Sequence, residues 1–186
     1  MTYCSACGSA LPAAAGFCTR CGADNRHHPK LLVACFVHCG PRLLWMRRAL
    51  APQKGFWAIP AGFMESGESM VEAAARETRE ETGVVLDPAQ LSLFMMGTIS
   101  FISEVYVAFR GAAPDLACSI GPEALDAQFF SRDELPWDEI AYPQANHSIL
   151  AAYDNIESGR FQQYHCEMTA DKNDLTPIAY GPLVAP

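Results

Sequence analysis

The stretch "ARETREETGV", residues 75–84, carries three glutamates within five positions, Glu77, Glu80 and Glu81. Glu77 and Glu81 are four residues apart, so on a helix they lie on the same face. Like charges at this spacing destabilise a helix. The stretch therefore needs a feature that tolerates converging negative charge, and we start from it to work out the fold and the function.

The sequence around this stretch predicts a helix from Ser69 to about Thr82. Ser69 and Glu72 form an S-x-x-E capping box at its start, and Gly83 lies where a C-terminal stop belongs. At 100° per residue one side of the helix gathers Val71, Ala74, Ala75, Thr78 and Thr82. We predict that this side faces the core.

Two interpretations of the glutamates compete. A helix rich in Glu and Arg usually presents a solvated, charged face. However, Glu77 and Glu81 border the apolar stripe, with Glu80 and Ala73 beside them. Carboxylates that converge in a partly buried place need a cation, and hard oxygen ligands select Mg²⁺ or Mn²⁺. On spacing alone the two interpretations are equally supported. Arg76 can hold Glu80, four residues later, in place.

The residues before the helix extend the pattern. From Gly62 the sequence reads G-x5-E-x7-R-E-T-R-E-E-T-G-V, through Glu68 and Arg76 to Val84. This pattern resembles the Nudix box at every polar and glycine position. Its one departure is Thr78, where an aliphatic residue is commoner, and we interpret it as a change in core packing. The resemblance implies an α/β protein, the Nudix α/β/α sandwich with a mixed β-sheet.

The resemblance also implies a pyrophosphohydrolase that acts on a nucleoside diphosphate linked to another group. The implied ligands for catalytic Mg²⁺ or Mn²⁺ are Gly62, through its carbonyl, and Glu77, Glu80 and Glu81. Glu80 would bind metal or help to activate water. Arg76 and Glu68 would orient the acids, so the implied catalytic set is Glu80, Glu81, Arg76 and Glu68.

Two CxxC pairs, Cys4 with Cys7 and Cys18 with Cys21, lie within residues 1–26, and a glycine follows each pair. Four thiolates suit tetrahedral Zn²⁺, and the glycines permit the positive φ of a tight knuckle turn. A site with four cysteines leaves no open coordination position, so we expect a structural zinc. A redox CxxC is the alternative, but two paired knuckles fit it poorly.

The order of these motifs divides the chain into a zinc ribbon at residues 1–26, a Nudix hydrolase domain at 27–160 and a C-terminal tail at 161–186. Apolar runs predict strands at residues 31–38, 42–48, 56–60, 84–86, 91–102, 105–109 and 127–130. A second helix is predicted from Gln144 to Glu157. The tail shows no clear period.

Charge and composition limit the partners. The chain has 186 residues and a formal net charge of −8, which argues against binding nucleic acid through phosphate neutralisation. The ribbon contributes only Arg20 and Arg26 as basic residues. Apolar runs stay below the roughly 20 residues of a membrane span, and the start lacks the build of a signal peptide. We therefore expect a cytoplasmic homodimer, acting on a small dinucleotide and binding neither nucleic acid nor a membrane.

The choice of substrate depends on the surrounding motifs. A zinc ribbon ahead of the box resembles the NADH pyrophosphatases, but their S-Q-P-W-P-F-P motif is missing from "LSLFMMGTISFISEVYVAF" (91–109). The pieces "RALAP", "WAIPAGFMESGES", "GPEALDAQFF" and "LPWDEIAY" instead resemble a second zinc-ribbon Nudix group, whose plant members hydrolyse FAD and ADP-ribose. FAD or ADP-ribose is therefore favoured. An NADH pyrophosphatase and a non-catalytic, nucleotide-sensing module are the alternatives.

Three further residues are predicted to contact the substrate. Phe63 would stack on a base, although a role in the core is equally supported. Arg47 and Arg48 point to opposite faces of a strand, so at most one of them reaches the diphosphate, and we choose Arg48. Glu123 or Glu104 would supply an extra carboxylate, with surface exposure as the alternative for each. Glu123 is preferred.

Overall fold

A computed structural model describes residues 2–12, 15–26 and 28–179 of the chain. Its strands are β1 Thr2–Tyr3, β2 Ala10–Leu11, β3 Lys30–Cys39, β4 Arg42–Arg48, β5 Trp57–Ala58, β6 Ala61–Phe63, β7 Ser92–Ile99, β8 Glu104–Ala112, β9 Ala124–Phe130, β10 Tyr164–Met168 and β11 Asn173–Pro177. The helices are α1 Met70–Thr82 and α2 Asn146–Ser158, with 3₁₀ turns at Pro88–Gln90, Ser100–Ile102, Trp137–Glu139 and Pro143–Ala145. This mixture confirms the predicted α/β class.

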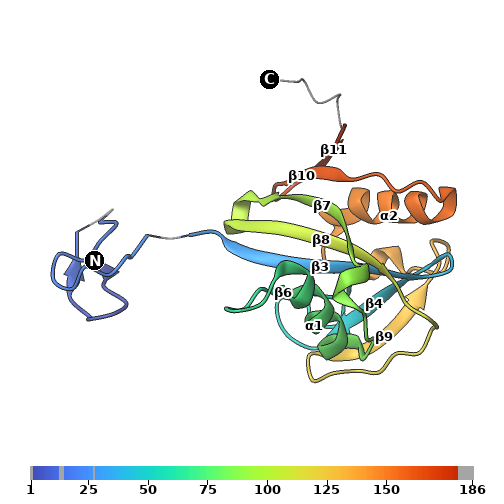
Figure 1. Ribbon diagram of the computed structural model, residues 1–186, viewed down its shortest axis with the longest axis horizontal. Coiled ribbons are helices and arrows are strands. Elements are labelled where there is room, and N and C mark those ends of the chain that lie inside the picture. The colour runs from blue at the N-terminus through green and yellow to red at the C-terminus, as the bar shows by residue number, and fades with distance from the viewer. Residues whose placement is uncertain (1, 13–14, 27, 180–186) are drawn as a thin grey trace.

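Nine strands of the described residues form one mixed sheet. Seven of them follow the order β11-β10-β7-β8-β3-β4-β5, and β6 and β9 pair with β3 and β4 off this path. β3 pairs parallel with β8 along its length, whereas it pairs with β4 only at the hairpin, where His38 faces Leu43. Beyond that point β4 pairs with β9, and β6 takes the place beside β3. Figure 1 shows α2 and α1 on opposite sides of β3 and β8, so the sheet is covered on both faces.

The alternation of side chains along β3 separates two cores. Phe36 and Ala34 point to the side of α2 and pack with residues such as Tyr153. Val33 and Val37, one position out of phase, point to the side of α1. Because helices cover both faces, β3 is apolar from Leu31 to Val37 rather than alternating with polar residues. The predicted strands 31–38 and 42–48 are confirmed.

The caps of α1 are the predicted ones. The Ser69 side chain accepts a hydrogen bond from the Glu72 amide, and the Glu72 carboxylate accepts one from the Ser69 amide. Gly83 ends the helix in the left-handed region, with φ of 69°. Ala74, Thr78 and their neighbours on the predicted stripe are buried. The Thr78 hydroxyl donates to the carbonyl of Ala74, which satisfies it inside the core.

The predicted C-terminal tail, residues 161–186, contains two strands that the sequence did not predict. β10 lies parallel to β7, with Tyr164 opposite Met95, and β11 extends the sheet beyond it. The sequence "YHCEM" buries only alternate residues, Cys166 and Met168, so its pattern is weak by itself. Its partner is far away in the sequence. Residues 180–186 of the predicted tail lie outside the described residues.

The strand predicted at residues 84–86 is also wrong. This segment follows the helix cap and forms no strand, although Val84 and Leu86 are buried in the core on the α1 side. An apolar run can thus be buried without a neighbouring strand edge to pair with. The other predicted strands and the second helix are present, with ends shifted by a few residues.

The N-terminal unit has its own small core of Cys4, Leu11 and Cys18, and Figure 1 shows it at one side of the sheet domain. Its two short strands pair with each other, Thr2 opposite Leu11. Met1 lies outside the described residues, and the predicted division at residue 26 stays a prediction. Across the described chain, the helices are too short or too polar to span a bilayer.

The close approach of β10 to β7 predicts a specific instability. A Cβ added at Gly97 would lie 1.6 Å from the carbonyl oxygen of Cys166. Gly97→Ala should therefore push β10 away and lower the free energy of unfolding by about 1–3 kcal/mol. Thr98→Ala, an exposed change on the same strand, should cost less than about 0.5 kcal/mol. Urea unfolding of both variants measures this, and equal losses would show that the contact does not matter.

Candidate metal and diphosphate site

The turn from β6 into α1 brings Gly62 against the acidic helix. β6 pairs with the first half of β3, Gly62 opposite Val33, and this register holds the loop over α1. A Cβ built on Gly62 would lie 2.1 Å from the carboxyl carbon of Glu77. Only glycine therefore allows the backbone and this carboxylate to come so close.

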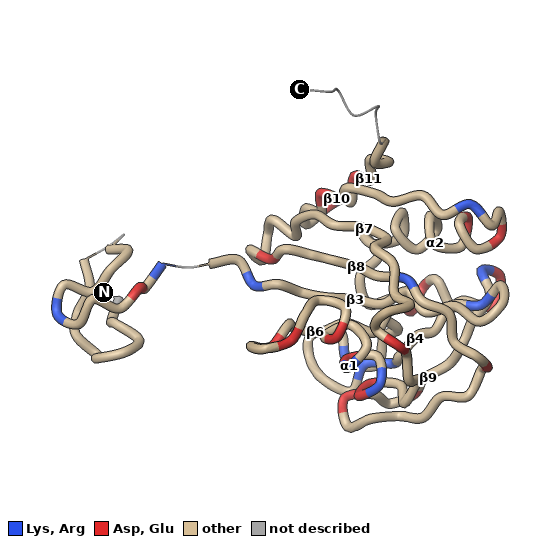
Figure 2. The backbone as a smooth tube through the Cα atoms, viewed as in Figure 1, with Lys and Arg blue, Asp and Glu red and all other residues tan. Residues whose placement is uncertain are grey.

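The guanidinium of Arg76 organises the acids. It binds Glu68 with two hydrogen bonds, Nε to Oε2 at 3.0 Å and Nη2 to Oε1 at 2.7 Å. Its Nη1 donates to Glu77 at 2.8 Å and to Glu80 at 3.3 Å, and Nη2 also donates to the carbonyl of Phe63. Figure 2 shows the resulting mixture of acidic and basic residues along α1. One cation thus holds three carboxylates and the loop before the helix.

Glu81 is the most enclosed of the acids, with 6% of its surface exposed. Its Oε2 accepts a hydrogen bond of 3.0 Å from the amide of Ala61 on β6. Burial raises the pKa of Glu81 to about 8, although the Ala61 amide opposes the shift. The charges of Glu77 and Glu123 raise this pKa further, and Arg48 lowers it. The carboxylate is therefore buried beside other negative groups.

The donor set fits a hard divalent cation. Burial also raises the pKa of Glu77, whereas hydrogen bonds from Arg76 lower the pKa of Glu68 to about 2. The raised pKa values show that too little positive charge lies near these enclosed carboxylates to balance them. Mg²⁺ or Mn²⁺ would supply that charge. Among the described residues these glutamates do not converge on one point. Arg76 and the Ala61 amide hold their oxygens instead.

The two arginines at the end of β4 have different partners. Arg47 donates to the carbonyl of Gly55 at 2.6 Å and pairs with Glu139 at 3.0 Å, away from the acids. Arg48 influences Glu81 electrostatically. The pairing of β4 with β9 shifts register between the two arginines, and such a bulge re-aims side chains. Arg48 is therefore the arginine near the site.

The extra carboxylate near the acids belongs to Glu123. Its charge acts on both Glu77 and Glu81, and its carbonyl fixes the loop by accepting from the amide of Ala49 at 2.9 Å. Glu104 instead lies opposite Lys30 on β8, and the charge that acts on it is that of Lys30. The structure thus brings Glu123, and not Glu104, to the acidic cluster.

Phe63 lies at the rim of an open hollow rather than in the core. It is 43% exposed, and the ammonium of Lys30 lies 4.9 Å from the centre of its ring. Phe63, Lys30, Leu31 and Met64 line this open hollow of about 320 Å³. This position suits a ring that stacks on a base.

Three contacts at the site were missed from the sequence. Lys30 precedes the strand predicted at residues 31–38, but it begins β3. The ring of Tyr142 lies 5.7 Å from the Arg48 guanidinium, and the Ala61 amide binds Glu81. A backbone amide carries no sequence signal. The other two contacts depend on how distant segments pack.

The four cysteines of the N-terminal unit converge on one point. Their sulfur atoms all lie within 4.8 Å of one another. Cys4 Sγ is 3.6 Å from Cys21 Sγ, and Cys7 Sγ is 3.7 Å from Cys18 Sγ. A zinc tetrahedron with Zn–S bonds of about 2.3 Å has edges of about 3.8 Å, close to these separations. The set therefore fits Zn²⁺.

Both knuckles have the same backbone geometry. Gly8 donates to the carbonyl of Cys4 and Gly22 to that of Cys18, and both glycines have positive φ. The amide of Cys7 lowers the pKa of Cys4, and the hydroxyl of Ser9 lowers that of Cys18 to about 6. At Cys4 and Cys18 these donors favour the thiolate, the form that binds zinc.

Comparison with known proteins gives consistent results. The family described as "NUDIX domain" matches residues 28–152. The chain is 39% identical to the NAD-capped RNA hydrolase NudC of Stutzerimonas stutzeri over 142 residues, 72% of this chain and 49% of that protein. It is 31% identical to the ADP-ribose pyrophosphatase of Methanocaldococcus jannaschii over 115 residues, 59% of this chain and 66% of that protein.

A solved structure covers more of the chain. The crystal structure of a NUDIX hydrolase from Nitrosomonas europaea matches with a TM-score of 0.75 at 30% identity, over 89% of this chain and 97% of that one. The chain spans between 33% and 66% of the length of the curated relatives just named and of the 8-oxo-dGDP phosphatase NUDT18 of Mus musculus.

The cysteine geometry predicts one structural zinc. The protein should purify with about one zinc ion per chain, because four converging thiolates hold the ion without an open position. Cys4→Ser combined with Cys21→Ser should remove it, as measured by elemental analysis. Cys39→Ser, a half-buried cysteine on β3, is the control. Unchanged zinc in the double variant would contradict the site.

Proposed function

We propose, because this chain belongs to the Nudix family, that it is a pyrophosphohydrolase that cleaves the diphosphate of a nucleoside diphosphate linked to another group. FAD and ADP-ribose are the favoured substrates, and Mg²⁺ or Mn²⁺ is the proposed catalytic ion. The observation that carries the proposal is the enclosed acidic cluster on α1. Arg76 orders it, and Gly62 lies against it without a side chain.

The proposed ligands of the catalytic ion are the Gly62 carbonyl and the carboxylates of Glu77, Glu80 and Glu81. A divalent ion there would polarise a phosphoryl oxygen and lower the pKa of the attacking water. Arg76 and Glu68 keep the carboxylates in place through the paired hydrogen bonds described above. This preorganisation means that little rearrangement is needed when the substrate arrives.

The remaining residues would bind and orient the substrate. Arg48 would hold the diphosphate, since its Nε is fixed by the carbonyl of Pro52 at 2.9 Å and its charge reaches the acids. Phe63 would stack on a base in the open hollow that it lines. Glu123 would add a carboxylate from the loop before β9. Each of these roles is part of the proposal.

Two observations bear on the choice of substrate. The relative from Methanocaldococcus jannaschii is an ADP-ribose pyrophosphatase, which supports a diphosphate-bridged substrate of this kind. NudC, an NAD-capped RNA hydrolase, favours an NAD-type dinucleotide as the second candidate. The missing S-Q-P-W-P-F-P motif argues for a substrate of the ADP-ribose kind over an NAD-type dinucleotide. The complete set of Glu77, Glu80 and Glu81 argues against a module that only senses nucleotides.

The basic residues of the ribbon bear on the proposal that the protein does not bind nucleic acid. Arg26 forms an ion pair of 2.6 Å with Asp24 and lies 4.8 Å from the ring of Phe17. Of the two basic residues there, one is thus already paired, which leaves little to attract phosphates. A homodimer and a cytoplasmic location stay predictions.

The carboxylates are tested by removing one charge at a time. Glu77→Gln and Glu81→Gln should each lower kcat with Mg²⁺ more than about 100-fold, because a neutral amide is a poor ligand for a hard cation. Arg79→Ala is the control. The Arg79 side chain is 60% exposed, and its distance of 3.9 Å from Glu80 is at the long limit of an ion pair. Near-normal turnover of Glu81→Gln would show that the metal site is assigned wrongly.

The substrate is tested with a panel of FAD, ADP-ribose, NADH and dGTP. We expect kcat/KM to be highest for FAD or ADP-ribose, with cleavage inside the diphosphate. The products should be AMP with FMN or with ribose 5-phosphate, identified by mass. A preference for NADH would favour the second candidate, and a preference for dGTP would leave only the general hydrolase.

A further inference from the structure

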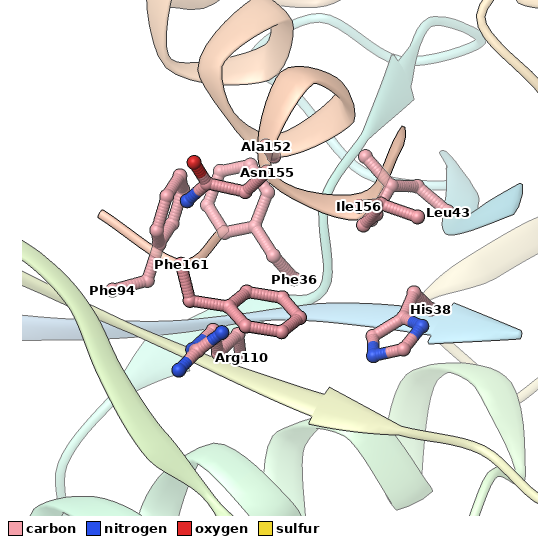
Figure 3. Close-up of a pocket in the computed structure, with 9 residues that line it drawn as sticks. All are labelled: Phe36, His38, Leu43, Phe94, Arg110, Ala152, Asn155, Ile156 and Phe161. Carbon is pink, nitrogen blue, oxygen red and sulfur yellow. The ribbon is translucent and has the colours of Figure 1, made fainter. Parts of the chain in front are cut away.

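The two faces of the sheet differ in what they hold. Figure 3 shows the cavity between the sheet and the end of α2, which the rings of Phe36, Phe94 and Phe161 line. Its volume is about 10 Å³, room for about one water molecule. It is therefore a gap in the packing rather than a ligand site. The acids lie on the other face, where the segment 118–123 meets the end of α1.

The segment 118–123 binds the C-terminal end of α1. The last carbonyls of a helix have no partner within the helix itself. The amide of Ser119 donates to the carbonyl of Thr82 at 2.8 Å. The amide of Gly121 donates to the carbonyl of Glu81 at 3.3 Å. The segment is thus joined to the backbone of α1 at a residue whose side chain is a proposed metal ligand.

Gly121 allows this contact because it has no side chain. A Cβ built there would lie 1.7 Å from the carbonyl oxygen of Glu80 and 3.5 Å from the Cα of Glu81. These are backbone atoms of α1, which cannot move aside as the tip of a side chain can. The φ of Gly121 lies outside the left-handed region. The obstacle to a side chain at this position is therefore the contact with α1.

A tight turn follows and presents Glu123. The amide of Ala124 donates to the carbonyl of Gly121 at 3.2 Å, which closes a β-turn with Pro122 and Glu123 at its centre. The ring of Pro122 fixes its own φ and so stiffens the link between Gly121 and Glu123. Glu123 is exposed, so the backbone of the turn, rather than burial of the side chain, sets where its carboxylate lies.

The far side of the turn is fixed next to Arg48. The carbonyl of Glu123 accepts a hydrogen bond of 2.9 Å from the amide of Ala49, and Ala124 lies opposite Arg48 across β4 and β9. The charge of Glu123 acts on the enclosed acids of α1. The turn therefore links these acids to the arginine proposed to hold the diphosphate.

We propose that Gly121 is a positioning residue for the metal site, because its close contact with α1 holds Glu123 where that carboxylate can help to bind the catalytic ion. This inference rests on the proposed function. A simple cap of α1 would need the amide of Gly121 but would make no demand on Glu123. A positioning role requires instead that Gly121 acts on metal binding through Glu123.

The test measures the binding of Mn²⁺ to the full chain as purified, with no substrate present. Gly121→Ala should weaken this binding at least about tenfold, because groups that hold a metal ligand in place change metal affinity by such factors. Glu123→Gln should show a similar loss. Ile120→Ala changes the neighbouring side chain, which is 59% exposed, and should bind Mn²⁺ normally.

A double-mutant cycle separates positioning from capping. If Gly121 acts through Glu123, adding Gly121→Ala to Glu123→Gln should weaken Mn²⁺ binding further by less than about twofold. Losses that multiply would overturn the inference, and so would equal binding by Gly121→Ala and Ile120→Ala. In either case the proposed function stands if the unchanged protein hydrolyses ADP-ribose or FAD with Mn²⁺. If the unchanged protein neither binds Mn²⁺ nor hydrolyses them, both proposals are wrong.

A second variant covers the case in which Gly121→Ala does not fold. Pro122→Gly loosens the same turn without placing a side chain against α1. It should weaken Mn²⁺ binding in the unchanged protein and have little effect in Glu123→Gln. An equal loss in both backgrounds, or no loss in either, would contradict the positioning role.

Discussion

One guanidinium, that of Arg76, ties the acidic helix to the segment that precedes it. It ties Glu68 and the carbonyl of Phe63, both before α1, to Glu77 and Glu80 on the helix. A single positive charge serves three carboxylates, so negative charge remains in excess at an enclosed place. The hydrogen bonds of Arg76 allow the helix to form although its glutamates repel one another. A divalent cation would balance the negative charge that Arg76 leaves uncompensated.

The elements that depend on local interactions were predictable. The capping box of Ser69 and Glu72 and the stop at Gly83 act within a few residues, so the limits of α1 follow from the sequence. The threonines show the same logic, since Thr78 satisfies its hydroxyl on the carbonyl of Ala74, within its own helix. Threonine can thus occupy an apolar position in the core without a distant partner.

What was missed depends on distant partners. Residues 84–86 look like a strand, yet they form none and bury Val84 and Leu86 in the core on the α1 side. β10 and β11 look like a tail, because their short sequences acquire strand character only next to β7. At the candidate site the Nudix pattern predicted the acids, Gly62 and Arg76. The Ala61 amide and Tyr142 act through packing that the spacing of residues does not describe.

The parallel pairing of β10 with β7 also affects the order of folding. Tyr164 and Met95 are roughly 70 residues apart, and closing so long a loop costs entropy before the contact repays it. During synthesis, β7 and β8 can pair while β10 is still inside the ribosome, so the outer edge of β7 is bare for a time. An uncovered strand edge pairs readily with other chains. The uncovered edge of β7 therefore exposes the growing chain to aggregation, and a chaperone bound there would protect it.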